Sequence, residues 1–128
     1  MKRPVFILKR KDFKIYRIQL IKMIKFLIKA SYTPEGVKGL LKVGGTNRKQ
    51  TVEKMLNDMG GHLEAFYYAF GECDVYAIGE LPDTVSAAAM SMAINASGMV
   101  TLSATILLST EDIDKAVKVS ADYHTPGS

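Results

Sequence analysis

Apolar and mostly polar side chains alternate along residues 24–32, whose sequence is IKFLIKASY. The apolar set, at every second position, is Ile24, Phe26, Ile28 and Ala30. The intervening set is Lys25, Leu27, Lys29 and Ser31. Successive side chains of a strand point to opposite faces of a sheet, so this pattern predicts a strand with one firmly buried face.

Two helical segments are predicted between this strand and residue 61. Thr33 is a suitable capping residue, and Pro34 suits the first helical position, where its missing N–H has no intrahelical partner. The Gly-Gly pair at residues 44–45 interrupts this helix, and Thr46 can cap a second one. The second helix has one apolar stripe, formed by Val52, Met55, Leu56 and Met59. A further Gly-Gly pair at residues 60–61 ends it.

The chain is organised around a predicted hairpin over residues 62–81, HLEAFYYAFGECDVYAIGEL, with a tight turn at residues 71–72. The predicted cross-strand pairs are Tyr68 with Val75, Tyr67 with Tyr76, and Ala69 with Asp74. Strict alternation places on one face His62, Phe66, Tyr68, Phe70, Val75 and Ala77. It places on the other face Leu63, Tyr67, Tyr76 and Ile78. Because both faces carry bulky side chains, the sheet needs two covers, and we expect helices on one face and a second subunit on the other.

The remaining segments predict the helices and the strand that follow the hairpin. Residues 84–97 predict an Ala-rich helix that Asp83 caps and Gly98 ends. Residues 99–109 predict a fourth strand and residues 110–120 a last helix. The order strand, broken helix, strand, strand, helix, strand predicts an α+β, ferredoxin-like βαββαβ fold. Its antiparallel four-stranded sheet would carry helices on one face and form a homodimer through the other, open face.

Charge divides the chain unevenly. Residues 1–22 hold eight Lys and Arg against one Asp, a net charge of +7, whereas residues 23–128 hold nine against twelve acids, a net charge of −3. We therefore expect a domain over residues 23–120, a basic extension before it and a flexible tail at residues 121–128. The extension is either a flexible or non-native tail, with Met23 as the true start, or an arm for an anionic surface, or a structural element. The acidic body argues against a nucleic-acid partner.

Two compositional features bear on location. No apolar run approaches the ~20 residues of a membrane span. Cys73 is the single cysteine, which excludes an internal disulfide and a thiolate zinc site and suits a reducing compartment. We expect a cytoplasmic protein without a metal or other cofactor.

Four runs of the sequence carry a family resemblance. They are YTPEGVKGL at residues 32–40, MGGHLEAFYYAFGECDVYAI at residues 59–78, LPDTVSAAA at residues 81–89 and STEDI at residues 109–113. These runs resemble the GYD domain family, small proteins without an assigned activity that are grouped with the dimeric α/β-barrels. The resemblance covers roughly residues 23–119 and implies a ferredoxin-like domain that forms a dimer.

The chain departs from the family pattern at two places. The Gly-Tyr-Asp motif of the family name stands here as Gly71-Glu72-Cys73-Asp74, with cysteine in the place of tyrosine. The resemblance also implies an arginine in the last strand, but residues 101–107 contain no basic side chain. An anionic ligand held from that strand is therefore not expected.

Candidate polar residues gather around the hairpin. Asp74 could act as a base or bind a polar ligand group, but an Asp near a turn more commonly accepts hydrogen bonds from backbone N–H groups, and we favour that structural role. His62 could carry a proton or bind a ligand, although a lone histidine is more often an ordinary surface residue. Cys73 lies between two acids, which favour its protonated, unreactive form.

Aromatic side chains provide the other candidates. Tyr67, Tyr68 and Tyr76 could line a small apolar pocket with hydroxyl groups, and Tyr32 could stand at its mouth. The alternative for this cluster is plain packing in the core and the dimer interface. The segment GGTNRK at residues 44–49 only partly resembles a phosphate-binding loop, and we interpret it as a loop with solvated charges.

Three classes of function stay open. The first is a homodimer that binds or senses a small molecule through Tyr32, His62, Tyr67, Tyr68, Asp74 and Tyr76. The second is a small cofactor-independent enzyme with Asp74 or His62 as the catalytic group, which the family resemblance implies by analogy with monooxygenases of the dimeric α/β-barrel type. The third is a structural interaction module without a pocket.

Overall fold

The computed structural model describes residues 23–127, and the basic extension at residues 1–22 lies outside them. The described part contains four strands and three helices in the order β1 (Ile24–Tyr32), α2 (Pro34–Asp58), β2 (His62–Tyr68), β3 (Val75–Leu81), α3 (Thr84–Ala96), β4 (Val100–Leu107) and α4 (Thr110–Val117). Every predicted element is present, and the boundaries differ from the prediction by a few residues at most.

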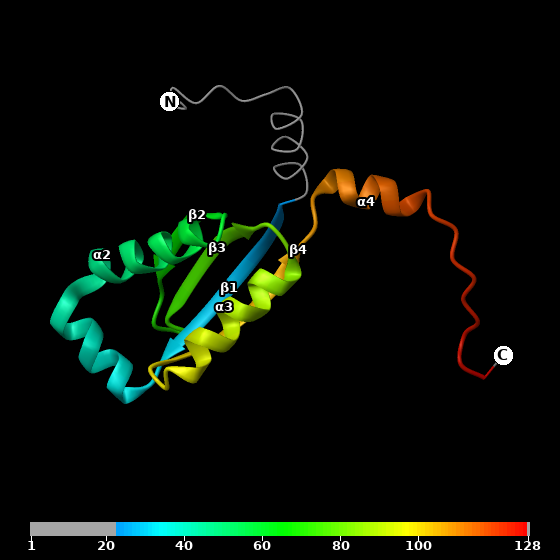
Figure 1. Ribbon diagram of the computed structural model, residues 1–128. Helices are drawn as coiled ribbons and strands as arrows, with labels where there is room; N and C mark the ends of the chain where they lie inside the picture. Colours follow the sequence, from blue (N-terminus) through cyan, green and yellow to red (C-terminus); the bar gives the residue numbers. More distant parts are fainter. Residues whose placement is uncertain (1–22, 128) are drawn as a thin grey trace, which may run out of the picture.

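The four strands form one sheet in the order β2-β3-β1-β4, and each neighbouring pair is antiparallel. Helices α2 and α3 lie on the same face of this sheet (Figure 1). The opposite face, called here the open face, is not covered by any element in residues 23–127. This arrangement confirms the predicted α+β, ferredoxin-like fold.

The core lies between the sheet and the two helices. Its buried side chains are Phe26, Ile28, Ala30, Leu56, Val75, Ala77, Leu81, Ala87 and Met90. Strand β1 contributes three of the four alternating apolar positions that the sequence predicts, and the fourth, Ile24, packs against the cluster while half-buried. Burial of this shared face is what orients the strand in the sheet.

The hairpin has the predicted register near its turn. Tyr67 pairs with Tyr76 and Tyr68 with Val75, and the Ala69 N–H donates to the Asp74 carbonyl at 2.9 Å. The turn itself is wider than predicted, because the strands end at Tyr68 and Val75. Its left-handed residue is Phe70, with φ of 54°, rather than glycine.

A β-bulge at the start of β2 overturns one prediction. The register shifts between Leu63 and Ala65, so that Leu63 lies opposite Gly79 and His62 opposite Glu80. Leu63 therefore packs against the core, and His62 belongs to the open face, the reverse of the faces predicted by strict alternation. The extra residue of the bulge, Glu64, breaks the two-residue period on which that prediction depended.

Helix α2 is broken where the sequence predicts. Gly44 has φ of 84° and ψ of 168°, which no helical residue adopts, and the chain bends there into two helical segments. Thr33 caps the first segment by accepting a hydrogen bond from the Gly36 N–H at 3.2 Å. In Figure 1 the first segment leads away from the end of β1 and the second returns over the sheet.

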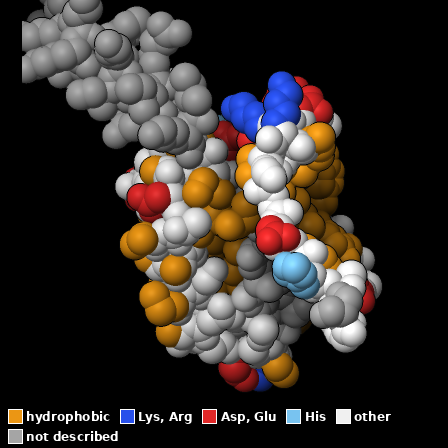
Figure 2. All heavy atoms as spheres, turned by 90° about the vertical axis from the view of Figure 1, so that its right-hand side faces the viewer, with side chains coloured by type: hydrophobic (Ala, Val, Ile, Leu, Met, Phe, Trp, Pro, Cys, Tyr) orange, Lys and Arg blue, Asp and Glu red, His pale blue; other side chains and the backbone are white. Residues whose placement is uncertain are grey.

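Helix α4 stands apart from the sheet layer (Figure 1). Ser109 and Asp112 form a reciprocal capping box at its start, with hydrogen bonds of 3.0 and 3.1 Å, but none of its residues is buried. Figure 2 shows hydrophobic side chains gathered on the surface behind this helix. Residues 118–127 contain no helix or strand, and the flexibility of the tail at residues 121–128 stays a prediction. None of the helices in residues 23–127 is long and apolar enough to span a membrane.

Candidate functional site

A cavity of about 100 Å³ lies between the sheet and helices α2 and α3. The sheet contributes Ile28, Phe66, Val75 and Leu102 to its wall, and the helices contribute Met55 and Met90, among other apolar residues. The only lining residues with polar side-chain atoms capable of hydrogen bonding are Tyr32, Arg48 and Thr51. An apolar chamber with a few polar groups is typical of a small-molecule site.

The cavity continues into a wider groove between the kinked part of α2 and the C-terminal end of α3. This groove, of about 490 Å³, shares five lining residues with the cavity, namely Tyr32, Arg48, Met55, Ile94 and Val100. The bend at Gly44 carries the first segment of α2 away from the sheet and leaves room for the groove. A ligand would therefore enter past Tyr32 and Arg48.

Tyr68 connects the sheet to the bend of α2. Its hydroxyl donates a hydrogen bond to the Gly45 carbonyl at 3.0 Å. Burial raises the pKa of Tyr68 to about 12, an interaction with the Tyr32 hydroxyl adds to the rise, and the positive charge of Arg48 acts in the opposite direction. Tyr32 and Arg48 line both the cavity and the groove, and Tyr68 lies near them without lining either space.

Aromatic contacts hold the Tyr68 ring in place. The ring of Phe66 meets it edge-on, with centroids 5.3 Å apart, and the ring of Phe70 stacks on it at 5.9 Å. Such pairs add about 0.5–1.5 kcal/mol beyond the apolar area that they bury. The stacked contact also compensates for the left-handed backbone of Phe70, which a non-glycine residue adopts only at a cost.

Asp74 has the structural role that its place in the turn predicts. Its carboxylate accepts a hydrogen bond from the Tyr32 N–H at 2.8 Å, and its own N–H donates to the Ala30 carbonyl at 2.9 Å. These two bonds extend the pairing between β1 and the hairpin beyond the last strand residues. Asp74 does not line the cavity or the groove.

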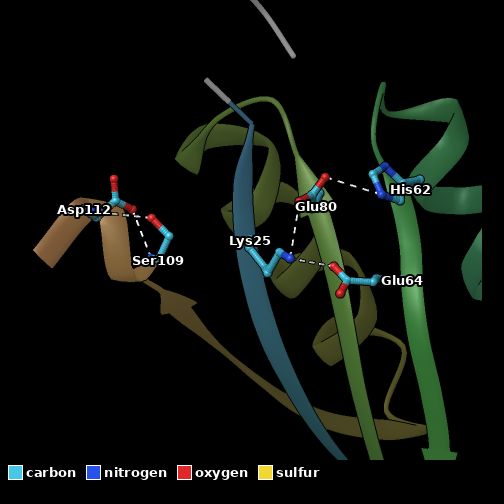
Figure 3. A network of polar contacts seen from close by, with 6 residues as sticks. All are labelled: Lys25, His62, Glu64, Glu80, Ser109 and Asp112. Atoms are coloured by element: carbon cyan, nitrogen blue, oxygen red, sulfur yellow. Dashed lines mark hydrogen bonds and ion pairs between the residues drawn. The ribbon is translucent and has the colours of Figure 1, made fainter. Parts of the chain in front are cut away.

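His62 lies in a charged network on the open face (Figure 3). Its Nε2 is 3.3 Å from an oxygen of Glu80, whose other oxygen is 3.7 Å from the Lys25 ammonium. The Lys25 ammonium is also 2.7 Å from Glu64, and this hydrogen bond is the main cause of the raised pKa of Lys25. His62 and Asp74 are therefore separate, and neither faces the cavity.

The other two tyrosines also belong to the open face. Tyr67 is 70% exposed and pairs with Tyr76 across the hairpin. The pKa of Tyr76 is raised, chiefly by a hydrogen bond with Cys73. The Cys73 side chain is itself buried, and its sulfur lies 3.7 Å from the Val75 carbonyl. Of the six predicted binding residues, only Tyr32 lines the cavity, and Tyr68 lies near it without lining the cavity or the groove.

Arg48 lines the cavity but is not among the residues predicted from the sequence, because residues 44–49 have the pattern of a loop with solvated charges. A pattern in the sequence could have found it. Arg48, Val52, Met55 and Met59 follow one another at spacings of four, three and four residues, so Arg48 continues the apolar stripe of α2. A charged residue on a buried stripe indicates a polar position at the edge of the core.

Within residues 23–127, no three His, Cys, Asp or Glu side chains gather as metal ligands would. The polar side chains that line the cavity among these residues are those of Tyr32, Arg48 and Thr51, which can donate or accept hydrogen bonds.

A four-stranded antiparallel sheet under two helices, with an apolar cavity between the layers, defines a ferredoxin-like α+β domain. Residues 26–117 match the GYD domain family, and the chain belongs to that family. The match confirms the resemblance seen in the sequence. No curated protein and no solved structure matches the chain.

Proposed function

We propose that this protein binds a small molecule in the cavity between its sheet and helices and that it does so as a homodimer. The observation that carries the proposal is the cavity itself, whose apolar wall ends at a polar mouth formed by Tyr32 and Arg48. A core with a purely structural role is expected to fill a void beside an arginine, because the atoms that line an empty space lose favourable packing contacts.

The open face supports the homodimer. Its apolar side chains include Leu27 and Ile78, which are neighbours in the register of β1 and β3, together with Leu107 and the Tyr67–Tyr76 pair. A second copy can cover this face with the same face, which is the self-complementary contact of a two-fold dimer. The network of Lys25, Glu64 and Glu80 then lies towards the rim of the contact.

A binding role accounts for the site residues better than catalysis does. The predicted catalytic candidates, Asp74 and His62, are engaged in a backbone hydrogen bond and in a contact with Glu80 on the open face. An enzyme would need one of them at the cavity. We propose that residues 23–120 are the working domain in the cytoplasm, where a single buried thiol such as Cys73 stays reduced.

Native mass spectrometry tests both parts of the proposal. Protein produced from Met1 and from Met23 is expected to give a dimer, with a small molecule that is retained under gentle conditions. Val52→Phe places a ring in the cavity and is expected to release that molecule, whereas Val37→Phe, on the same helix but outside the cavity lining, is expected to retain it. A folded monomer without any ligand would contradict the proposal.

A further inference from the structure

We infer that the ligand is a small monocarboxylate, with its carboxylate bound by Arg48 and a short apolar body inside the cavity. The inference rests on the proposed binding function and names the chemical class of its ligand. It follows from the charge, the polar partners and the size of the site.

Within residues 23–127, no acid pairs with the charge of Arg48. Its side chain is half-buried, lines both the cavity and the groove, and forms no ion pair with any residue in the described part of the chain. Lys25 pairs with Glu64 and Lys54 with Asp58, whereas Lys29 and Lys49 resemble Arg48 in having no ion pair among residues 23–127, but neither lines the cavity or the groove. A half-buried guanidinium without an anion has lost hydration that nothing replaces, and a carboxylate matches its donor geometry in a bidentate way.

The neighbouring groups favour a single negative charge. Tyr32 also lines both spaces and adds a hydroxyl donor, whereas the Tyr68 hydroxyl already donates to Gly45. The groove contains one acid, Glu35, whose carboxylate lies 3.5 Å from the Lys38 ammonium. A single arginine in a groove that also contains an acid suits a monoanion, because a phosphate dianion would need a second cation beside Arg48.

The volume limits the apolar part. A dry engineered cavity of ~150 Å³ binds benzene, so the cavity of about 100 Å³ found here suits one ring or a short branched chain. The carboxylate then lies at the junction of cavity and groove, where Arg48 and Tyr32 stand.

Methionine methyl NMR of the full chain provides the test, with benzoate, the neutral aromatic compound benzyl alcohol and inorganic phosphate as probes. Met55 and Met90 line the cavity, whereas Met92 is 67% exposed on α3 and serves as an internal control. Benzoate is expected to shift the Met55 and Met90 signals without moving Met92. It is also expected to bind about 10- to 100-fold more tightly than benzyl alcohol, because charged hydrogen bonds are strong and depend on Arg48.

Two variants separate the charge from the cavity. Arg48→Gln is expected to reduce the benzoate affinity to that of benzyl alcohol, while Lys49→Gln, the neighbouring exposed cation, leaves it unchanged. Two results would contradict the inference that the ligand is a carboxylate. One is that Arg48→Gln binds benzoate as tightly as the wild type does, and the other is that the wild type binds benzoate and benzyl alcohol with equal affinity. The inference would also be contradicted if phosphate displaced benzoate from Arg48 without shifting the Met55 and Met90 signals. If neither aromatic probe moves Met55 or Met90, the proposed binding function itself is wrong.

Discussion

The Tyr68 hydroxyl donates a 3.0 Å hydrogen bond to the carbonyl of Gly45, 23 residues earlier in the chain. Gly45 directly follows the bend of α2, so this bond joins the edge strand β2 to the point where the helix changes direction. The position of the bend sets the width of the groove that leads to the cavity. One hydroxyl thus connects the hairpin to the mouth of the site.

Tyr68→Phe is expected to lower the free energy of unfolding by about 1 kcal/mol, the usual net value of one hydrogen bond. Urea denaturation measures this loss, and amide exchange should increase in the helix turn after Gly44. Tyr67→Phe is the matched control, because Tyr67 is 70% exposed on the other face. An equal loss in both variants would mean that the Gly45 bond contributes nothing specific.

The difference in stability between the wild type and Tyr68→Phe should depend on pH. The pKa of Tyr68 is about 12 in the folded protein and about 10 in the unfolded chain, since burial favours the neutral phenol. Its contribution to stability is therefore complete below pH 10 and is lost as the pH rises from 10 towards 12. The stability difference between wild type and Tyr68→Phe is expected to shrink over that range in urea titrations. A difference that is constant to pH 12 would contradict this assignment.

Asp74→Ala is expected to destabilise the fold by about 1.5–3 kcal/mol, because it leaves the half-buried Tyr32 N–H without its charged acceptor. Asp74→Asn retains an acceptor oxygen and should lose less. Glu72→Ala, at an exposed position of the same turn, should change stability by no more than about 0.5 kcal/mol. Thermal unfolding compares the three. Loss of ligand binding in a fully stable Asp74→Asn protein would instead assign Asp74 to the site.

Two glycines of α2 should respond in opposite directions to alanine. A Cβ at Gly36 would clash with the carbonyl oxygen of Met99, whereas a Cβ at Gly39 meets nothing within 4 Å. Gly36→Ala is therefore expected to cost about 1–3 kcal/mol, as over-packing does, and Gly39→Ala to stabilise the helix by about 0.5–1 kcal/mol. Equilibrium denaturation decides the signs. A stable Gly36→Ala protein would show that the first turn of α2 can move away from Met99, the residue before β4.

Ile78→Lys is expected to convert the proposed dimer into a folded monomer. Ile78 pairs with Leu27 at the middle of the open face and is not part of the buried core, so a charge there opposes association but not folding. Val85→Lys, on the 76% exposed surface of α3, is the control and should stay dimeric. Light scattering after gel filtration measures the mass, and circular dichroism verifies the fold. A dimeric Ile78→Lys protein would place the contact elsewhere.

The sequence by itself determined the features that depend on local pattern. Alternation over β1, the caps Thr33 and Asp83, the break at Gly44 and the pairing of Tyr67 with Tyr76 all follow from neighbouring residues. Each depends on side-chain period, backbone freedom or turn geometry, which act within a few residues of the chain. The order of these elements then predicted the ferredoxin-like fold.

Only the tertiary structure decided where the polar side chains face. A one-residue bulge at Glu64 moved His62 to the open face, an effect that counting positions cannot foresee. Asp74 meets Tyr32 across 42 residues, and Arg48 reaches the cavity only because α2 folds back over the sheet after Gly44. The cavity is the space left between side chains of the sheet and side chains of helices α2 and α3, which come from distant segments. The residues that line it therefore depend on packing rather than on sequence spacing.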